Sequence, residues 1–137
     1  MRKATTHIDL FIPEKFSGMN EFITANRAAP QVGNSLKHKN QDVIKAYLLQ
    51  YMSKHHIRRI EPPVYISYTF QEKNRRRDLD NISGFFHKVF QDALVEVGLL
   101  QDDGWKDIQG FRDNFKVGNS YGVHVVIMTD VKNIKKK

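Results

Sequence analysis

The stretch VYISYTFQEKNRRRDLDNISGFFHKVFQDALVEVG, residues 64–98, places a strand, a charged loop and a helix in direct succession. Apolar and polar side chains alternate over residues 64–70, which is typical of a β-strand with one buried face. Apolar residues then recur at helical spacing over residues 82–97, and Gly98 provides a helix stop signal. The strand therefore delivers the chain into the charged loop at residues 75–80, and a long amphipathic helix follows.

The charged loop joins two groups that do not normally share a site. Arg75, Arg76 and Arg77 stand before two carboxylates, Asp78 and Asp80. Arginines attract phosphate and bare carboxylates repel it, so both fit one site if a divalent cation binds the carboxylates. In an extended segment, side chains two residues apart point to one face and can share an ion. Mg²⁺ takes such oxygen ligands and completes its shell with water and substrate phosphate. The alternative is a solvated loop with incidental charges.

Length and charge narrow the class of protein. A chain of 137 residues with a net charge of +7 and a pI near 9.7 is predicted to form one domain with a polyanionic partner. The absence of cysteine excludes disulfides, thiol catalysis and cysteine-based zinc sites. The sequence contains neither an apolar run of about 20 residues nor a signal-peptide core. We therefore expect a cytoplasmic protein with no membrane association.

The remaining segments predict an α+β fold. Outside residues 64–98, the pattern predicts a strand at residues 7–13 that ends at Pro13, an irregular loop at 14–38 with a short helical turn at 21–25, an amphipathic helix at 40–55, and strands at 108–117 and 123–129. The last strand is apolar on both faces, so we expect it inside the sheet. Two main helices and these strands predict a two-layer mixed sheet covered on one side. The domain is expected to span residues 1–131, with a disordered basic tail at 132–137.

An ordered set of motifs resembles a known family. The set comprises R-R-D-L-D-N at residues 76–81, K-x-x-x-D-A-L at 88–94, a glycine, and D-D at 102–103. It is similar to the RusA family of Holliday-junction resolvases, small enzymes common in phages and prophages. The resemblance is strong over residues 75–110. It implies a RusA-like homodimer, encoded by a bacterium or a phage, that cuts four-way junction DNA with Mg²⁺ or Mn²⁺ in DNA recombination and repair.

The resemblance also implies roles for individual residues. The catalytic metal ligands would be Asp78, Asp80 and Asp103, with Asp102 as a supporting ligand. Lys88 matches the essential helix lysine of the family, although the segment between Asp80 and Lys88 is about four residues longer, close to one helical turn. The expected DNA contacts are Arg75, Arg76 and Arg77, together with Arg58, Arg59 and the long basic loop. The implied reaction is metal-assisted phosphodiester hydrolysis, with Arg77 or Lys88 stabilising the charge on the phosphate.

Two further questions concern the dimer. The phenylalanines of the long helix, Phe85, Phe86 and Phe90, are candidates for a dimer interface or for the core. A helix from Asn81 to Gly98 spans about 26 Å at 1.5 Å per residue. The five residues from Gly98 to Asp103 cover at most about 18 Å. One chain would therefore struggle to bring Asp103 back to Asp80, which predicts sites built from two subunits.

Two alternative functions remain open at the level of sequence. One is a nuclease of the same fold that acts on other branched DNA, such as flaps or replication forks. The other is a non-catalytic DNA-binding or replication-accessory protein whose acidic residues are merely solvated. The second alternative predicts no dependence on a metal ion, whereas both nucleases require one.

Overall fold

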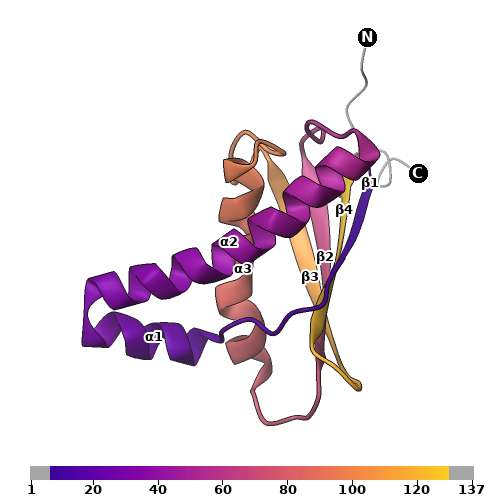
Figure 1. The fold of residues 1–137 in the computed structure, drawn as a ribbon. Coiled ribbons are helices and arrows are strands. Elements are labelled where there is room, and N and C mark those ends of the chain that lie inside the picture. Colours follow the sequence, from indigo (N-terminus) through magenta and orange to yellow (C-terminus); the bar gives the residue numbers. More distant parts are fainter. Residues whose placement is uncertain (1–6, 130–137) are drawn as a thin grey trace.

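A computed structural model describes residues 7–129, so the predicted basic tail lies outside the described residues. The elements along the chain are β1 (His7–Ile12), α1 (Met19–Ala28), α2 (Pro30–His55), β2 (Val64–Glu72), α3 (Leu79–Glu96), β3 (Ile108–Val117) and β4 (Gly122–Thr129). All four predicted strands are confirmed. Figure 1 shows the helices gathered on one side of the sheet, which confirms a two-layer α+β arrangement with a mixed sheet.

The sheet has the strand order β1-β4-β2-β3. Strand β4 is an inner strand, as its two apolar faces predicted, and it pairs antiparallel with both of its neighbours. In contrast, β2 and β3 are parallel, and α3 forms the crossover between them. This β2–α3–β3 unit brings the carboxyl ends of two parallel strands to the same edge of the sheet as the N-terminus of α3.

The core lies between α3 and the covered face of the sheet. Every second residue of β2 is buried, from Val64 to Glu72, as the alternating pattern predicted. Phe85, Phe86 and Phe90 are almost completely buried and belong to this core. Their helical spacing turns them toward the sheet, so the suggestion that they form a dimer interface is wrong and the core alternative is right.

The irregular loop expected at residues 14–38 is instead a helical hairpin made of α1 and the first turns of α2. The expectation of two main helices is therefore wrong, because residues 7–129 form three. Gly33 and Asn34 fall in the range predicted to be a loop, but both lie inside α2. A β-carbon on Gly33 would lie 3.1 Å from the α-carbon of Asn26, so this glycine allows α1 and α2 to pack closely. Pro30 starts α2 at a position where its missing N–H is tolerated.

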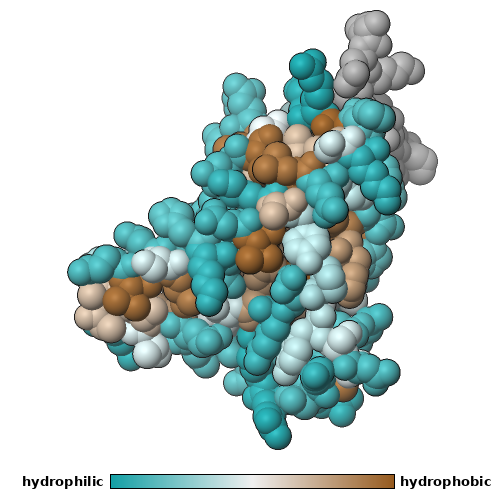
Figure 2. Space-filling view, viewed as in Figure 1, coloured by the Kyte–Doolittle hydropathy of each residue, from teal (hydrophilic) through white to brown (hydrophobic). Residues whose placement is uncertain are grey.

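The hairpin extends beyond the sheet, and its far end carries apolar surface between polar flanks in Figure 2. Asn40 anchors its base, because its side-chain amide donates hydrogen bonds to the Ser17 hydroxyl and the Leu36 carbonyl. The predicted end of the helix at His55 is confirmed. Within residues 7–129, no helix is both long and apolar enough to cross a membrane.

Candidate functional site

The loop after β2 leads into α3 earlier than the sequence pattern indicated. Asp78 is the N-cap residue with extended backbone angles, and the helix begins at Leu79. Asp80 therefore lies in the first helical turn, and the expectation that Asp78 and Asp80 share one face of an extended segment is wrong. Residues two apart on a helix do not face each other. A helix that begins at Leu79 is favoured because the Asp80 carboxylate in its first turn interacts favourably with the helix dipole.

A cavity of about 590 Å³ opens beside this helix start. Its walls come from the basic loop, the first turn of α3 and the end of β3. The charged and polar residues that line it are Glu72, Asn74, Arg75, Arg77, Asp78, Asp113, Asn114 and Lys116. The carboxyl ends of parallel strands are a common position for ligand sites. The cavity therefore brings cationic side chains and carboxylates to the edge of the sheet where a phosphate-bearing ligand is expected.

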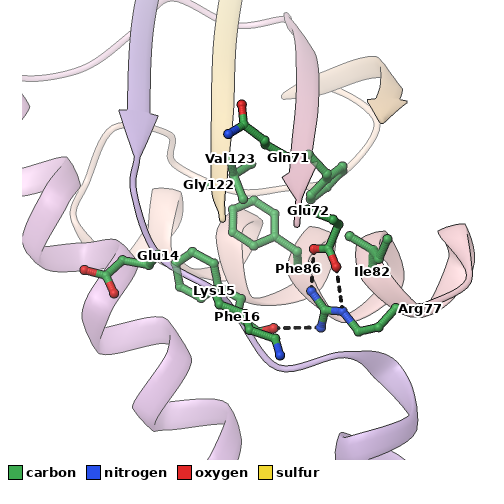
Figure 3. A pocket seen from close by; sticks show the side chains of 11 residues that line it. Glu14, Lys15, Phe16, Gln71, Glu72, Arg77, Ile82, Phe86, Gly122 and Val123 are labelled. Carbon is green, nitrogen blue, oxygen red and sulfur yellow. Dashed lines mark hydrogen bonds and ion pairs between the residues drawn. The ribbon is translucent and has the colours of Figure 1, made fainter. Parts of the chain in front are cut away.

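Arg77 is held by the fold rather than presented to solvent. Its Nε and one terminal nitrogen donate to the two carboxylate oxygens of Glu72 at 3.1 and 2.6 Å, and its other terminal nitrogen donates to the Phe16 carbonyl at 2.9 Å. Figure 3 shows this arrangement from close by. The Glu72 side chain is only 8% exposed. Arg77 thus ties the segment after β1 to the end of β2, and bidentate pairs of this kind are strong and directional.

The neighbouring arginines differ from Arg77. Arg75 and Arg76 are exposed, and within residues 7–129 no ion pair involves either of them. Of the three predicted phosphate contacts in this loop, these two therefore have their guanidinium groups available. Arg58 and Arg59 are also exposed, and Arg59 pairs with Glu61 at 3.2 Å. Both lie near the other end of α3, because the adjacent Ile60 N–H donates to the Leu99 carbonyl.

The second pair of predicted metal ligands lies at the opposite end of α3. Asp102 and Asp103 follow the C-terminus of the helix, and the Asp103 N–H donates to the Asp102 carboxylate at 2.8 Å. A helix of 18 residues is about 27 Å long, and Figure 1 shows the two loops at its opposite ends. Within the described part of the chain, no group of three or more histidine, aspartate or glutamate residues is close enough to hold a metal ion. One chain therefore separates Asp78 and Asp80 from Asp102 and Asp103.

Lys88 also lies away from the cavity. It stands eight residues after Asp80, about 12 Å along the helix, and its side chain is 64% exposed. Its ammonium group is 3.9 Å from the Asp92 carboxylate, whereas Lys37 of α2 approaches that carboxylate to 3.0 Å. Lys88 is thus on a solvated face of α3, without close contact to the predicted ligands of its own chain.

A further polar pair was missed by the sequence reasoning. The Nε2 atom of His87 lies 2.8 Å from the Asp113 carboxylate, and both side chains are largely buried. The His87 ring packs against Phe111 and Tyr68, with ring centroids 4.5 and 4.9 Å away. Burial raises the pKa of the Tyr68 hydroxyl well above its ordinary value. An aspartate between Phe111 and Phe115 on one face of a strand was the available signal, because a charge on a buried face requires a partner.

Asp113 also lines the cavity that Asp78 borders. The structure therefore gathers Asp78 and Asp113 around one opening and leaves Asp102 and Asp103 at the far end of α3. No protein-family model matches this chain, and no curated protein matches it in sequence. The function is accordingly inferred from the residues and their arrangement.

Proposed function

We propose that the protein is a Mg²⁺-dependent endonuclease of the RusA type that cuts four-way junction DNA as a homodimer. The observation that carries the proposal is the arrangement at the start of α3. There, the exposed Arg75 and Arg76 are followed closely in the chain by the exposed carboxylates of Asp78 and Asp80. A helix N-terminus adds a partial positive charge that favours a DNA phosphate at the same position.

The carboxylates at this end suit a hard divalent cation. Asp78 occupies the N-cap position, yet its side chain makes no capping hydrogen bond. Asp80 is exposed, and within residues 7–129 neither acid takes part in an ion pair. Both acids therefore keep free oxygen ligands of the type that Mg²⁺ requires. Asp78 and Asp80 do not share an extended face, but both lie at the start of α3. A cation bound at this helix start, with Asp103 and Asp102 from a second copy, would supply a water of lowered pKa and polarise the phosphate.

The other side chains have distinct roles in this proposal. Arg75 and Arg76 hold the phosphate backbone and offset its charge. Arg77 keeps the loop in place through Glu72 and Phe16, so it acts as a positioning residue. Arg58 and Arg59 would contact the backbone farther from the cut, where such contacts orient the DNA without reading its sequence.

The proposal is tested with labelled four-way junction, flap and linear duplex DNA of matched sequence, each with Mg²⁺ or EDTA. We expect nicking of the junction that requires Mg²⁺ and a much lower rate on linear duplex. Faster cutting of the flap would support the alternative nuclease for other branched DNA. Binding without cutting under every metal condition would contradict a nuclease and support a DNA-binding accessory protein.

Asp80→Asn tests the metal site in the same assay, because the substitution removes the charge of one proposed metal ligand and leaves the arginines in place. We expect nicking to fall at least about 100-fold, given that even outer-shell partners of a metal site contribute 10–100-fold. Junction binding should persist and should still weaken with salt. Asp42→Asn is the control, since Asp42 is an exposed acid on α2 whose contact with Lys45 is 3.9 Å long. Wild-type nicking by Asp80→Asn would remove Asp80 from the metal site.

A further inference from the structure

The hairpin formed by α1 and the first turns of α2, residues 18–39, projects from the fold and is called the arm below. No residue of α1 is buried, and the first buried residue of α2 is Gly33. Figure 1 shows the arm extending away from the strands of the sheet. Helices in proteins are stabilised mostly by packing of an apolar face. A hairpin that buries so little of its own surface keeps that surface open to a partner.

The base of the arm is fixed to the start of α3. The Asn20 N–H donates to the side-chain carbonyl of Asn81 at 2.7 Å. A β-carbon on Gly18 would lie 2.6 Å from the same oxygen, so the two segments approach closely. The Phe22 ring stacks on Phe85 of α3, with centroids 4.8 Å apart. Because Asn81 lies in the first turn of α3, the arm has a fixed direction relative to the proposed cleavage site.

The far end of the arm exposes apolar side chains. Ile23 of α1 is 40% exposed and Val32 of α2 is 45% exposed. The helices are joined by Ala-Ala-Pro at residues 28–30. Figure 2 shows this end of the molecule as apolar surface between polar flanks. We call Ile23, Val32 and residues 28–30 the tip. Apolar surface that gathers on a projection and has a polar rim is typical of a binding site.

The charge of the arm favours DNA as the partner. Its arginine and lysine residues are Arg27, Lys37 and Lys39. Its only acid, Glu21, caps the start of α1. Lys37 pairs with Asp92 at 3.0 Å, whereas Arg27 and Lys39 are exposed and, within residues 7–129, take part in no ion pair. Two free cations beside the apolar tip fit a polyanion that also presents apolar surface.

We propose that the tip of the arm contacts base faces exposed at the branch point of the DNA, and that this contact selects branched DNA over linear duplex. The inference rests on the proposed nuclease function and adds a selectivity element to it. In a linear duplex, stacked bases cover each other's faces, whereas bases at a branch point can unstack. Apolar side chains that insert between bases are used in this way by proteins that kink DNA.

The length of the arm agrees with such a contact. Helix α1 has 10 residues, so it is about 15 Å long at 1.5 Å per residue. Its first turn is held against the start of α3, and its last turn leads into the tip. At 3.4 Å per base along one strand, the tip would lie about four base pairs from a phosphate held at the start of α3. The arm therefore reaches a branch point close to the proposed cut.

A fluorescent base at the branch point tests the contact without cleavage. 2-Aminopurine emits more strongly when it loses its stacking partners. One junction carries it at the branch point, and a second carries it in the middle of one branch. Titration with the protein in EDTA should raise emission from the branch-point base and leave emission from the other base unchanged. Equal responses from the two junctions, or no response from either, would overturn the proposal.

The double substitution Ile23→Ser with Val32→Ser removes the apolar tip and keeps every charge. We expect the rise in branch-point emission to disappear and junction affinity to fall about tenfold, because burying half of each side chain contributes about as much as burying one whole valine. Affinity for linear duplex should stay unchanged. Leu49→Ser is the matched control, since Leu49 is 51% exposed and lies about 25 Å farther along α2.

Three further measurements make the result specific. Circular dichroism checks that each variant is folded, and Ile23→Leu with Val32→Leu should preserve the emission change because it keeps the tip apolar. Wild-type emission and affinity in the folded double serine variant would overturn the proposal. Sedimentation of the protein without DNA identifies another occupant. A double serine variant that associates less with itself but binds junctions normally would make the tip a protein contact, which also overturns the proposal.

The two proposals can fail separately. A protein that raises branch-point emission through its tip but cuts no DNA in Mg²⁺ would retain the arm contact and reject the nuclease. Mg²⁺-dependent junction cutting with the same preference over linear duplex in the wild type and the double serine variant would retain the nuclease and reject the arm contact.

Discussion

The two ends of α3 differ in charge, anchoring and exposure, although both carry acids that the sequence assigned to one site. At the N-terminal end, Arg77 binds Glu72 and Phe16, and a cavity opens beside Asp78. At the C-terminal end, Asp102 and Asp103 lie in an exposed loop next to Trp105. The helix therefore acts as a spacer between an anchored basic end and an exposed acidic end. Each end holds half of the predicted set of metal ligands.

The variant with the largest expected effect tests whether the exposed C-terminal end of α3 takes part in DNA cleavage. Asp103→Asn should lower junction nicking at least about 100-fold, as expected for Asp80→Asn, because both acids would bind the same cation. Nicking is measured under single-turnover conditions with saturating protein, and folding is checked by circular dichroism. If Asp103→Asn retains wild-type nicking while Asp80→Asn does not, the two ends do not share a site.

Arg77→Ala should produce the largest loss of stability at the anchored end. Removing one partner of a buried, bidentate pair leaves the Glu72 carboxylate without compensation, which costs about 3 kcal/mol in unfolding free energy. Urea denaturation followed by circular dichroism measures this change. Arg76→Ala is the matched control, since Arg76 is exposed, and it should change the unfolding free energy by less than about 0.5 kcal/mol. Equal stability of the two variants would show that Arg77 is not an anchor.

Lys88→Ala examines the helix between the two ends. We expect nicking turnover to fall about tenfold or more if the lysine offsets charge on the phosphate, as the family resemblance implies. The unfolding free energy should change by only a few tenths of a kcal/mol, because the contact with Asp92 is a long i,i+4 pair. Turnover and urea denaturation are measured on the same preparation. Unchanged turnover would assign Lys88 to the solvated face alone.

The smallest effect concerns phosphate contact by a single arginine. Arg76→Ala should weaken junction binding severalfold, with a similar loss on duplex DNA, because a backbone contact carries no sequence information. The slope of log affinity against log salt should become shallower by about 1. Fluorescence anisotropy over a salt series measures both quantities. A slope equal to that of the wild type would mean that Arg76 makes no phosphate contact.

Local patterns were sufficient for most of the framework. The alternation in β2 and the helical spacing in α3 are properties of contiguous residues, and both elements form, although β2 continues to Glu72 and α3 begins at Leu79, earlier than the pattern indicated. The two apolar faces of β4 correctly indicated an inner strand. The sequence also determined the strongly basic charge and the order of arginines and aspartates around α3. These features need no knowledge of distant contacts.

Contacts between distant residues decided the rest. Gly33 and Asn34 were part of the predicted loop, yet they lie inside a 26-residue helix, where Gly33 packs closely against α1. Arg77 looked like a phosphate ligand equivalent to Arg76, and only the fold supplies Glu72 and Phe16 as its partners. Asp113 joins the cavity of Asp78 because β3 pairs in parallel with β2. A residue's periodicity is encoded locally, and so is the length of α3 that separates its two pairs of acids. A residue's neighbours in space depend instead on how the elements pack.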